Sequence, residues 1–549
     1  MRRMKGAAGL LTALLLAFQL SAQTFALANE DNGIKVVPVN FTHNGYSYEI
    51  EGVAKSTDGD YQIKSPARLA ARKLPSTYDP RSSGEITTVK DQASTGACWA
   101  FSALACAEQD LIKKGLENPS TEFSVPALVL SSNSGTATGK DDFSSGGNWL
   151  FAASALANGQ GLCYEDYEPF LESGTGNMIV SENKKSVSEY RLNYVMELSS
   201  TTQVKRKIME LGAVSASYFA GNGYMNHNNT AYYDPDASKN TIINHSVTVV
   251  GWDDNYSKDN FRYKPANNGA WLVKGSWGAD QDNDGFYWVS YDEAEFGQFC
   301  CYDFEESCDN TYHYSKMTGY VVNASNDGSV YGANVFTAKA DEKLDKAGFM
   351  YVGKTGSADY TLSVYTNVSD SDPIGVLETQ ISGSVSANGF YTVDFPEDIL
   401  LEEGEKYSIS VKFSGDSGRG YLLAESDRTS KAQSGQSYVS LNGKYWSDVG
   451  ADKTDSIGSL FIYAYTDDTA KPDKSSLESA LAKYGTLAGC EREANNARTV
   501  LADETASKND ISNAQKLLIS AAEEQDEALV ITTEAQWESF AKRVSSGES

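Results

Sequence analysis

The sequence predicts an α+β protein that is built from several units. In the globular part, helical patterns and small residues come first, from Cys98 to about Phe170, and strand patterns follow after about Tyr190. The two kinds of pattern do not alternate regularly, which argues against a doubly wound parallel sheet. At 549 residues the chain is also too long for one core, because domains usually run to about 100 to 200 residues. We therefore expect three or more units.

Residues 1–28 are predicted to be a secretory signal peptide. They have a basic start, an apolar stretch, and Ala26 and Ala28 in an A-x-A arrangement, so we expect cleavage after Ala28. The alternative is an uncleaved membrane anchor, although the apolar core is short for a span. No later segment is long and apolar enough to cross a membrane. We expect an exported protein, secreted or associated with the cell surface, in which residues 29–72 form a leader or short prosegment.

The charge of the chain argues against a nucleic acid partner. The formal net charge is -28, and removal of Arg2, Arg3 and Lys5 with the signal peptide leaves -31. Such a surface repels phosphates and favours solubility.

Seven cysteines are too sparse for a disulfide scaffold in a chain of this length, and an odd number leaves at least one thiol unpaired. The cluster of Cys300, Cys301 and Cys308 is expected either to form a disulfide or simply to end the strand-rich half. Adjacent residues of a strand point in opposite directions, so Cys300 and Cys301 cannot easily serve one metal.

Two further units are predicted after about residue 310. Residues 311–467 are rich in period-two strands, of which "KYSISVKF" is the clearest, with Tyr407, Ile409, Val411 and Phe413 on one face and polar residues on the other. This pattern predicts an antiparallel β-sandwich. Residues 472–528 are amphipathic with helical spacing, which predicts a small helical hairpin or three-helix module. Residues 529–549 begin another apolar pattern, and we interpret them as an incomplete or terminal segment.

The strongest chemical signal is a cysteine at the start of a predicted helix. In "VKDQASTGACWAFSALACAEQDLIKKG", Ser94 and Thr95 are plausible caps and Gly115 ends the apolar pattern. Cys98 then lies in the first turn, where unpaired amides and the helix dipole favour a thiolate. The alternative is a small buried cysteine, which is the interpretation we give to Cys106.

The second signal is His245 in "NHSVTVVGW", where strand alternation places it on the same side as Val247 and Val249. A single histidine on an apolar strand face is more often structural than catalytic. Paired with a cysteine at a helix terminus, however, it would supply an imidazolium–thiolate nucleophile.

Four ordered blocks of the sequence resemble the papain-like cysteine peptidases of the C1 family. They are "DQASTGACWAFS", "SSGGNWLFAASAL", "NHSVTVVGW" and "WLVKGSWG" with "DGFYWVSY", and the resemblance covers residues 74–302. It implies a two-lobed peptidase domain over residues 73–305, with a helical lobe, a β lobe and the substrate in the cleft between them. The whole chain resembles exported bacterial members in which a jelly-roll, lectin-like domain follows the peptidase.

The resemblance also implies roles for particular residues. Cys98 would be the nucleophile, His245 the base, and Gln92 a donor to the oxyanion hole beside the Cys98 N–H. Gly146 and Gly147 would pair with the substrate backbone. The implied reaction is hydrolysis of peptide bonds in a peptide or protein substrate through an acyl-enzyme, with no metal and no organic cofactor.

Gly275 departs from the family pattern, because it stands where an asparagine orients the catalytic histidine. Trp277, which covers that interaction in the family and which we assign to the substrate-binding region, is present. Losing a hydrogen bond to a charged group costs about 1.5 to 3 kcal/mol, which corresponds to roughly a ten- to few hundred-fold loss of rate. We therefore expect a slowed peptidase. The alternatives are a peptidase with a substitute orienting group and an inactive papain-like protein that acts in cell-surface adhesion or carbohydrate binding.

Two other departures concern processing. Thr95 stands where many plant and animal members have a disulfide cysteine, and the leader is about half as long as their inhibitory prosegments and lacks a long helical pattern. These differences weaken the expectation of zymogen control.

Two further features can be interpreted either as binding sites or as ordinary structural elements. "DQDNDG" (280–285) has the spacing of a calcium loop, but Tyr291 stands where a bidentate glutamate is needed, so a solvated hairpin loop is the preferred interpretation. Residues 311–467 could bind carbohydrate through aromatic side chains such as the adjacent Tyr445 and Trp446. A structural or protein-docking role is an equal alternative, because tyrosines in strands usually pack between sheets.

Overall fold

The computed structural model describes most of the chain between Val36 and Glu527. The described residues are 36–43, 46–54, 74–132, 143, 146–160, 162–165, 189–221, 223–236, 242–279, 284–316, 320–324, 328–369, 372–426, 432–451, 457–469, 473–503, 506 and 508–527. The expected signal peptide (1–28) and the terminal segment (529–549) lie outside these residues. The chain divides into two compact units, Met1–Thr469 and Ala470–Ser549.

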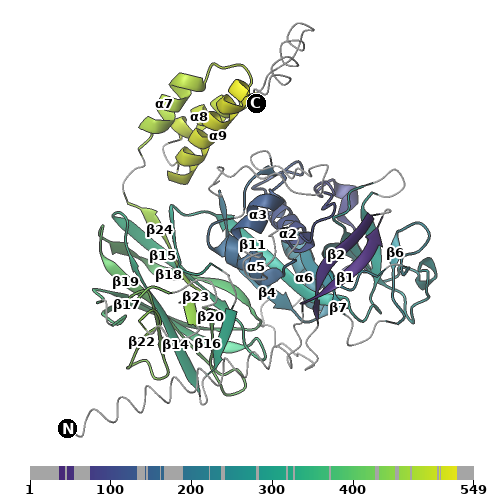
Figure 1. Ribbon diagram of the computed structural model, residues 1–549, viewed down its shortest axis with the longest axis horizontal. Helices are drawn as coiled ribbons and strands as arrows, with labels where there is room; N and C mark the ends of the chain where they lie inside the picture. Colours follow the sequence, from purple (N-terminus) through teal and green to yellow (C-terminus); the bar gives the residue numbers. More distant parts are fainter. Residues whose placement is uncertain are drawn as a thin grey trace, which may run out of the picture. The chain divides into compact units, whose positions relative to one another are not determined.

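In the first unit, helices predominate from Cys98 to Ala157 and strands predominate after Tyr190, as the sequence predicts (Figure 1). Its helices and short 3-10 segments are η1 (Pro80–Ser83), α2 (Cys98–Lys114), α3 (Val125–Ser131), α5 (Trp149–Ala157), α6 (Thr201–Leu211) and η3 (Lys258–Asn260).

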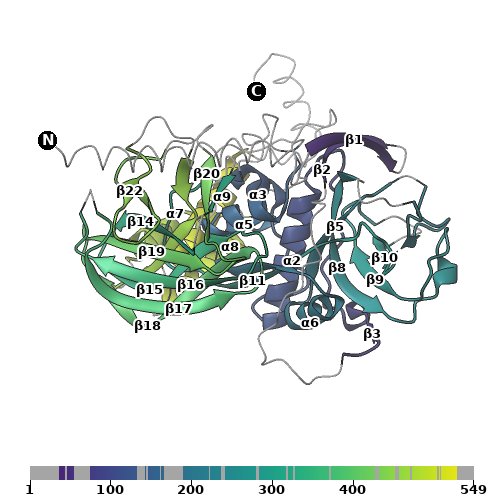
Figure 2. The same ribbon diagram turned by 90° about the horizontal axis from the view of Figure 1, so that it is seen from below.

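Helix α2 is the central helix of this unit, and it begins at Cys98. Gly115 ends it in the left-handed conformation (φ 73°), as expected. The predicted caps are wrong: Ala97 occupies the N-cap position without a side-chain hydrogen bond, and the Thr95 hydroxyl instead donates to Gln92 O (2.8 Å). Every residue from Cys98 to Leu111 is buried, because α2 packs on strands of the β lobe as well as on other helices (Figure 2).

One large sheet runs through most of the first unit. Neighbouring strands, in spatial order, are β12 (Asn310–Tyr312), β24 (Ile462–Asp468), β15 (Glu342–Tyr351), β18 (Gly389–Leu401), β4 (Tyr190–Leu198), β11 (Gly297–Glu306), β5 (Val214–Tyr218), β8 (His245–Asp253), β9 (Ala270–Lys274), β10 (Phe286–Ser290) and β6 (Ala231–Tyr232), with β3 (Thr77–Tyr78) paired to β8.

The sheet crosses from the peptidase-like half of the unit to the later strands at the pairing of β4 with β18. The register there is antiparallel and short, with Gly389 opposite Met196 and Tyr391 opposite Tyr194. The peptidase-like residues and those after 311 therefore share one sheet, a continuity that the sequence pattern does not indicate.

A second sheet covers the later part of the first, and the two form the expected antiparallel sandwich. Its strands, in spatial order, are β17 (Val376–Val385), β16 (Ala358–Thr366), β19 (Lys406–Ser414), β14 (Ser329–Thr337), β21 (Ser437–Ser440) and β22 (Ser447–Asp448). A third, three-stranded sheet contains β13 (Tyr320–Ala324), β20 (Tyr421–Ser426) and β23 (Ile457–Leu460).

Strand β19 carries the apolar face that the sequence predicts, and its four large side chains lie in the sandwich core. Its other face is also buried: the Ser408 hydroxyl donates to Pro373 O (2.5 Å) and Ser410 is almost fully covered. The polar residues of this face suggest contact with solvent, but other parts of the protein cover Ser408 and Ser410.

Part of the leader forms a β-hairpin of β1 (Val36–His43) and β2 (Tyr46–Ala54). Strand β2 pairs with β7 (Ile242–Ile243), which immediately precedes the segment of His245. This part of the predicted leader therefore forms strands, in agreement with the lack of a long helical pattern in its sequence.

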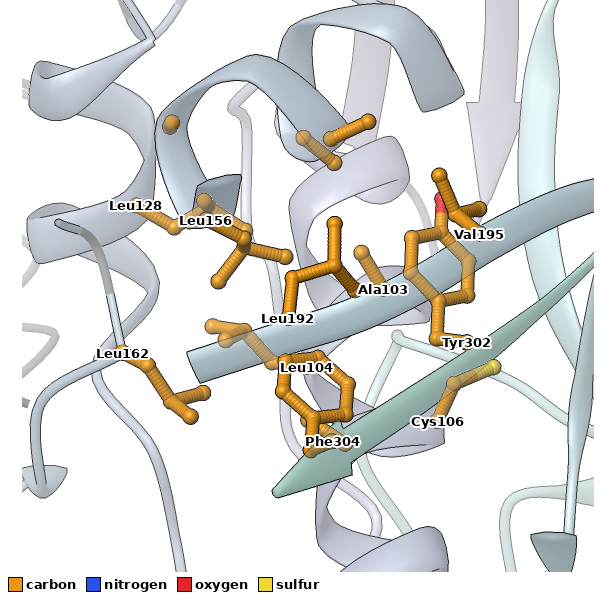
Figure 3. Close-up of a cluster of buried hydrophobic side chains, with 14 of the residues drawn as sticks. Ala103, Leu104, Cys106, Leu128, Leu156, Leu162, Leu192, Val195, Tyr302 and Phe304 are labelled. Atoms are coloured by element: carbon orange, nitrogen blue, oxygen red, sulfur yellow. The ribbon is translucent and has the colours of Figure 1, made fainter. Parts of the chain in front are cut away.

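The core of the helical lobe forms where α2, α3 and α5 meet β4 and β11, and it continues to side chains of the later strands, such as Phe390 and Tyr463. Figure 3 shows Leu104, Leu156, Leu192 and Phe304 gathered at its centre, and all four are buried. Because α2 also packs on β8, this core fixes the nucleophile-bearing helix against the strand that carries His245.

The second unit contains three helices within the described residues: α7 (Ser475–Tyr484), α8 (Glu491–Ala502) and α9 (Lys508–Glu527). Leu477, Ala494 and Leu518 are among the residues of its separate apolar core. Of the two arrangements that the sequence allows here, the three-helix module is the one observed. No helix among the described residues has the length and apolar run that a membrane crossing requires.

Candidate active site

Cys98 is the first residue of α2, as predicted, and its side chain is 7% exposed. Burial raises the pKa of this thiol, whereas hydrogen bonds from Ser246 (backbone and side chain) and from the backbone of Trp99 lower it. The uncapped helix terminus adds a field that favours the thiolate. Burial and the polar contacts thus act on the pKa of the Cys98 thiol in opposite directions, and burial is the larger effect.

His245 is the first residue of β8 and is 1% exposed. The indole of Trp277 stacks on its imidazole, with ring centroids 4.1 Å apart and planes 6° apart. The ring of Tyr218, across the strand pair β5–β8, meets the imidazole edge-on at 5.9 Å and 63°. Aromatic rings therefore contact the histidine from two directions.

Hydrogen bonds hold helix α2 against the strand of His245. The Ser102 hydroxyl of α2 donates to Val247 O of β8 (2.7 Å), and Val247 lies two residues after His245 in the strand. Deeper in the same interface, the buried Lys274 ammonium donates to Thr87 Oγ1 (2.6 Å) and lies 3.8 Å from the Glu108 carboxylate. These contacts fix the distance between helix and strand, which a nucleophile–base pair requires.

Cys98 and His245 line one small cavity of about 20 Å³. Its other lining residues are Gly96, Gly146, Gly147, Asn148, Ser217, Ile243, Asn244, Ser246 and Gln298. Four of the residues selected from the sequence are therefore brought together, namely the cysteine, the histidine and the two glycines. Gln92, Gly275 and Trp277 do not line this cavity.

The two glycines are required by the local geometry. Gly146 has a positive φ of 64°, which favours glycine. A Cβ on Gly147 would lie 2.5 Å from the indole of Trp99, the residue after the cysteine. The segment can therefore pass close to the start of α2 only without side chains.

Gln92 is fully buried behind the site, and its side chain is held at both ends. Its Nε2 donates to Thr95 O (2.7 Å), and its Oε1 accepts from the Ser276 hydroxyl (2.6 Å). Its backbone N–H donates to Ser276 O (2.7 Å). The amide is thus fixed relative to both the cysteine loop and the segment that contains Gly275.

Gly275 lies directly after β9, between the Lys274 and Ser276 side chains just described. A Cβ there would lie 3.2 Å from Gly285 O and 3.4 Å from Tyr287 Cε1, so a larger residue requires shifts of a few tenths of an ångström. A second cavity of about 20 Å³ lies beside it, lined in part by Ser102, Ser246 and Gly275. A cavity of this size holds a single water molecule.

Sequence reasoning missed the contribution of Ser246 and of two tyrosines, Tyr218 and Tyr287. Ser246 directly follows the selected histidine, so its proximity could have been inferred from that position alone. The two tyrosines come from β5 and β10, which the order of strands in the sheet brings close together. No spacing in the sequence indicates this contact.

The remaining chemical candidates are the cysteine cluster and the calcium-like loop. All seven cysteines are buried and none forms a disulfide, so the cluster of Cys300, Cys301 and Cys308 does not form the disulfide that was one of the two expectations. Cys300 and Cys301 lie in different apolar clusters, on opposite faces of β11. Among the residues that the structure describes, no group of three or more His, Cys, Asp or Glu side chains is arranged to hold a metal. Residues 280–283 of the expected calcium-like loop lie outside them, and Asp284 pairs with Arg81 (3.3 Å).

Family models agree with this geometry. Residues 74–325 match the papain family cysteine protease model, and residues 311–466 match the lectin like domain model. The chain carries a papain-family peptidase domain followed by a lectin-like domain.

Solved structures show the same combination. The structure of the cysteine protease and lectin-like domains of Cwp84, a surface layer associated protein of Clostridium difficile, is 27% identical in sequence, with a TM-score of 0.61. It covers 73% of this chain and 90% of that one. A second Cwp84 structure, after propeptide cleavage, is 28% identical with a TM-score of 0.62, and covers 72% of this chain and 99% of that one.

Among curated proteins, the papain-family domain is similar to the cathepsins. Cathepsin S of Bos taurus is 29% identical over 218 residues, which are 39% of this chain and 60% of that protein. Cathepsin K of Mus musculus is 24% identical over 216 residues, or 39% of this chain and 59% of that protein. The chain thus spans about three fifths of the length of these relatives.

Proposed function

We propose that the protein is a secreted cysteine endopeptidase that hydrolyses peptide bonds in peptide or protein substrates. The observation that carries the proposal is the shared cavity: the Cys98 thiol at the start of α2 and the His245 imidazole under Trp277 open into the same space. A nucleophile and a base in one cavity are what acyl transfer through a thiolate requires.

The steps follow from the positions of these groups. His245 takes the proton of Cys98, and the thiolate attacks the substrate carbonyl. The N–H of Cys98 stabilises the developing oxyanion, together with the second N–H of the Gln92 amide, whose first N–H donates to Thr95 O, and Gly146 and Gly147 pair with the substrate backbone. The imidazolium then protonates the leaving amine, and water, deprotonated by His245, hydrolyses the thioester.

We further propose that Gly275 makes this reaction slower than it would be with an asparagine. Without any replacement for the missing amide, the loss would be roughly ten- to a few hundred-fold. Burial raises the pKa of the Cys98 thiol, but the helix terminus and the hydrogen bonds of Ser246 and Trp99, which favour the thiolate, do not involve Gly275, so the reaction is weakened but not abolished.

The first test is cleavage of a denatured protein by the purified chain under reducing conditions, with Cys98→Ala in parallel. Cys98→Ala removes the nucleophile, so cleavage should fall to the background rate. Cys106→Ala is the matched control, because it removes a buried thiol from the same helix two turns away, and it should retain activity.

The contrary outcome is also informative. If the unmodified chain were as silent as Cys98→Ala while both remained folded, the peptidase proposal would fail. The alternative, an inactive papain-like protein that binds at the cell surface, would then be favoured.

For the lectin-like domain we propose a docking role toward carbohydrate or protein at the cell surface. The supporting observation is Tyr445, which is 74% exposed beside the largely covered Trp446. An exposed aromatic ring on a rigid sandwich suits either partner. The surface layer association named for Cwp84 supports the proposed location.

A further inference from the structure

Two buried tyrosines meet beneath the candidate active site. Tyr218 comes from β5 and Tyr287 from β10, and their hydroxyl oxygens are 2.9 Å apart. The two residues are 1% and 4% exposed, among apolar side chains of the β lobe. A buried hydroxyl without a partner costs about 1 to 3 kcal/mol, so each tyrosine holds the other in place.

Each member of this pair touches a different part of the site. The Tyr218 ring contacts the His245 imidazole edge-on, with centroids 5.9 Å apart. If a Cβ were added to Gly275, the nearest side-chain atom would be Tyr287 Cε1, at 3.4 Å. The hydroxyl pair therefore links the histidine to the position that lacks the asparagine.

The electrostatics place the pair close to the nucleophile as well. Burial raises the pKa of Tyr287, the hydrogen bond from Tyr218 lowers it, and the charge of Cys98 raises it. The pKa of Tyr218 is also raised, mainly by burial. Both phenols are therefore neutral near pH 7, and they act as hydrogen-bonding and packing groups rather than as charges.

The stacking contact and the edge contact restrict different motions of the histidine ring. Parallel stacking on Trp277 sets the plane of the imidazole but allows the ring to slide along the indole. An edge contact from Tyr218 restricts that sliding, and the hydroxyl bond to Tyr287 fixes Tyr218 in turn.

We propose that the Tyr218–Tyr287 hydroxyl pair positions the imidazole of His245 and so replaces part of the role of the missing asparagine. This inference rests on the proposed peptidase function. Tyr218 and Tyr287 are positioning residues, since they act on the substrate only through His245.

The central experiment is a double-mutant cycle between Tyr287→Phe and Gly275→Asn. Tyr287→Phe removes one oxygen and should lower kcat about tenfold, with little change in KM, because the histidine and not substrate binding is affected. Gly275→Asn restores an amide, so Tyr287→Phe should cost less than about threefold in that background. Gly275→Asn alone should raise kcat by less than the full ten- to few hundred-fold, because the tyrosines already supply part of the effect.

Further variants separate positioning from stability. Tyr287→Phe and Tyr218→Phe each leave one buried hydroxyl without its partner, whereas the double variant removes both and should recover thermal stability. If the pair positions His245, the double variant should still be slow. The matched control is Tyr463→Phe in β24, which removes a buried hydroxyl bonded to Ser315 Oγ (3.1 Å) and should leave kcat unchanged.

Four results would overturn the inference. Tyr287→Phe as fast as the unmodified chain would show that the hydroxyl has no role. An equal loss with and without Gly275→Asn would show a structural effect, and so would recovery of activity together with stability in the double variant. An unmodified chain as inactive as Cys98→Ala would overturn the peptidase proposal itself, and this inference with it.

Discussion

At the scale of single residues, two small residues near the proposed catalytic pair have opposite consequences. Under the proposed function, Gly275 takes an orienting hydrogen-bonding group away from His245. Ser246 adds one, because its hydroxyl and backbone N–H both hydrogen-bond to the Cys98 thiol. The Ser246 hydroxyl is itself held at 3.0 Å from that of Ser217. The thiol thus has a polar neighbour that partly offsets its burial.

Ser246→Ala should therefore raise the pKa of the Cys98 thiol. Burial raises this pKa, and the serine hydrogen bonds lower it, so removing the hydroxyl leaves burial less opposed. The thiolate fraction should fall at neutral pH and recover as the pH rises. Because the pKa of this buried thiol already lies above its ordinary value, alkylation of Cys98 by iodoacetamide is expected to be a few fold slower throughout the range of about pH 6 to 9 and to approach the rate of the unmodified chain only at higher pH. An equal slowing at every pH would point to altered access instead.

At the scale of elements, helix α2 and the joint between β4 and β18 matter most. Helix α2 begins at Cys98 without a side-chain cap, so no capping side chain competes for its first N–H groups. At the joint, Gly389 approaches the neighbouring strand so closely that a Cβ would lie 2.1 Å from Val195 O. A glycine is therefore needed where the two halves of the large sheet meet.

Gly389→Ala should destabilise the first unit by about 1 to 3 kcal/mol, because the strands must separate to admit the methyl group. Thermal unfolding measures the effect. Gly297→Ala in β11 is the matched control, since no heavy atom lies within 4 Å of its added Cβ. Equal melting temperatures for the two variants would show that the joint tolerates the change.

At the scale of the whole molecule, the large sheet makes the papain-family and lectin-like domains one compact unit, while the three helices form another. The sandwich core and the lobe cores are connected through shared strands. The described helices of the second unit share an apolar core of their own. The two compact units, and not the family domains, should therefore unfold as separate cooperative units.

Calorimetry of the full chain should show two transitions. Leu477→Ala in α7 removes a fully buried side chain, costs about 2 to 5 kcal/mol, and should lower only the transition of the helical unit. Gly389→Ala should lower only the transition of the first unit. A single transition that responds to both substitutions would contradict the division.

The sequence by itself determined the fold class, the family and the start of the nucleophile helix. Local patterns suffice for these, because helical spacing, strand alternation and a glycine terminator act over a few residues, and the blocks around Cys98 and His245 are contiguous. The same local view misplaced the cap of α2, which packing makes unnecessary.

Only the tertiary structure decided what surrounds the catalytic pair. The contact of Tyr218 with His245, the approach of Tyr287 to Gly275 and the pairing of β4 with β18 all join residues far apart in the chain. Such contacts depend on how strands are ordered in a sheet, and a non-consecutive strand order leaves no periodicity in the sequence. The residue types around Cys98 and His245 were therefore predictable, but the groups that hold them in position were not.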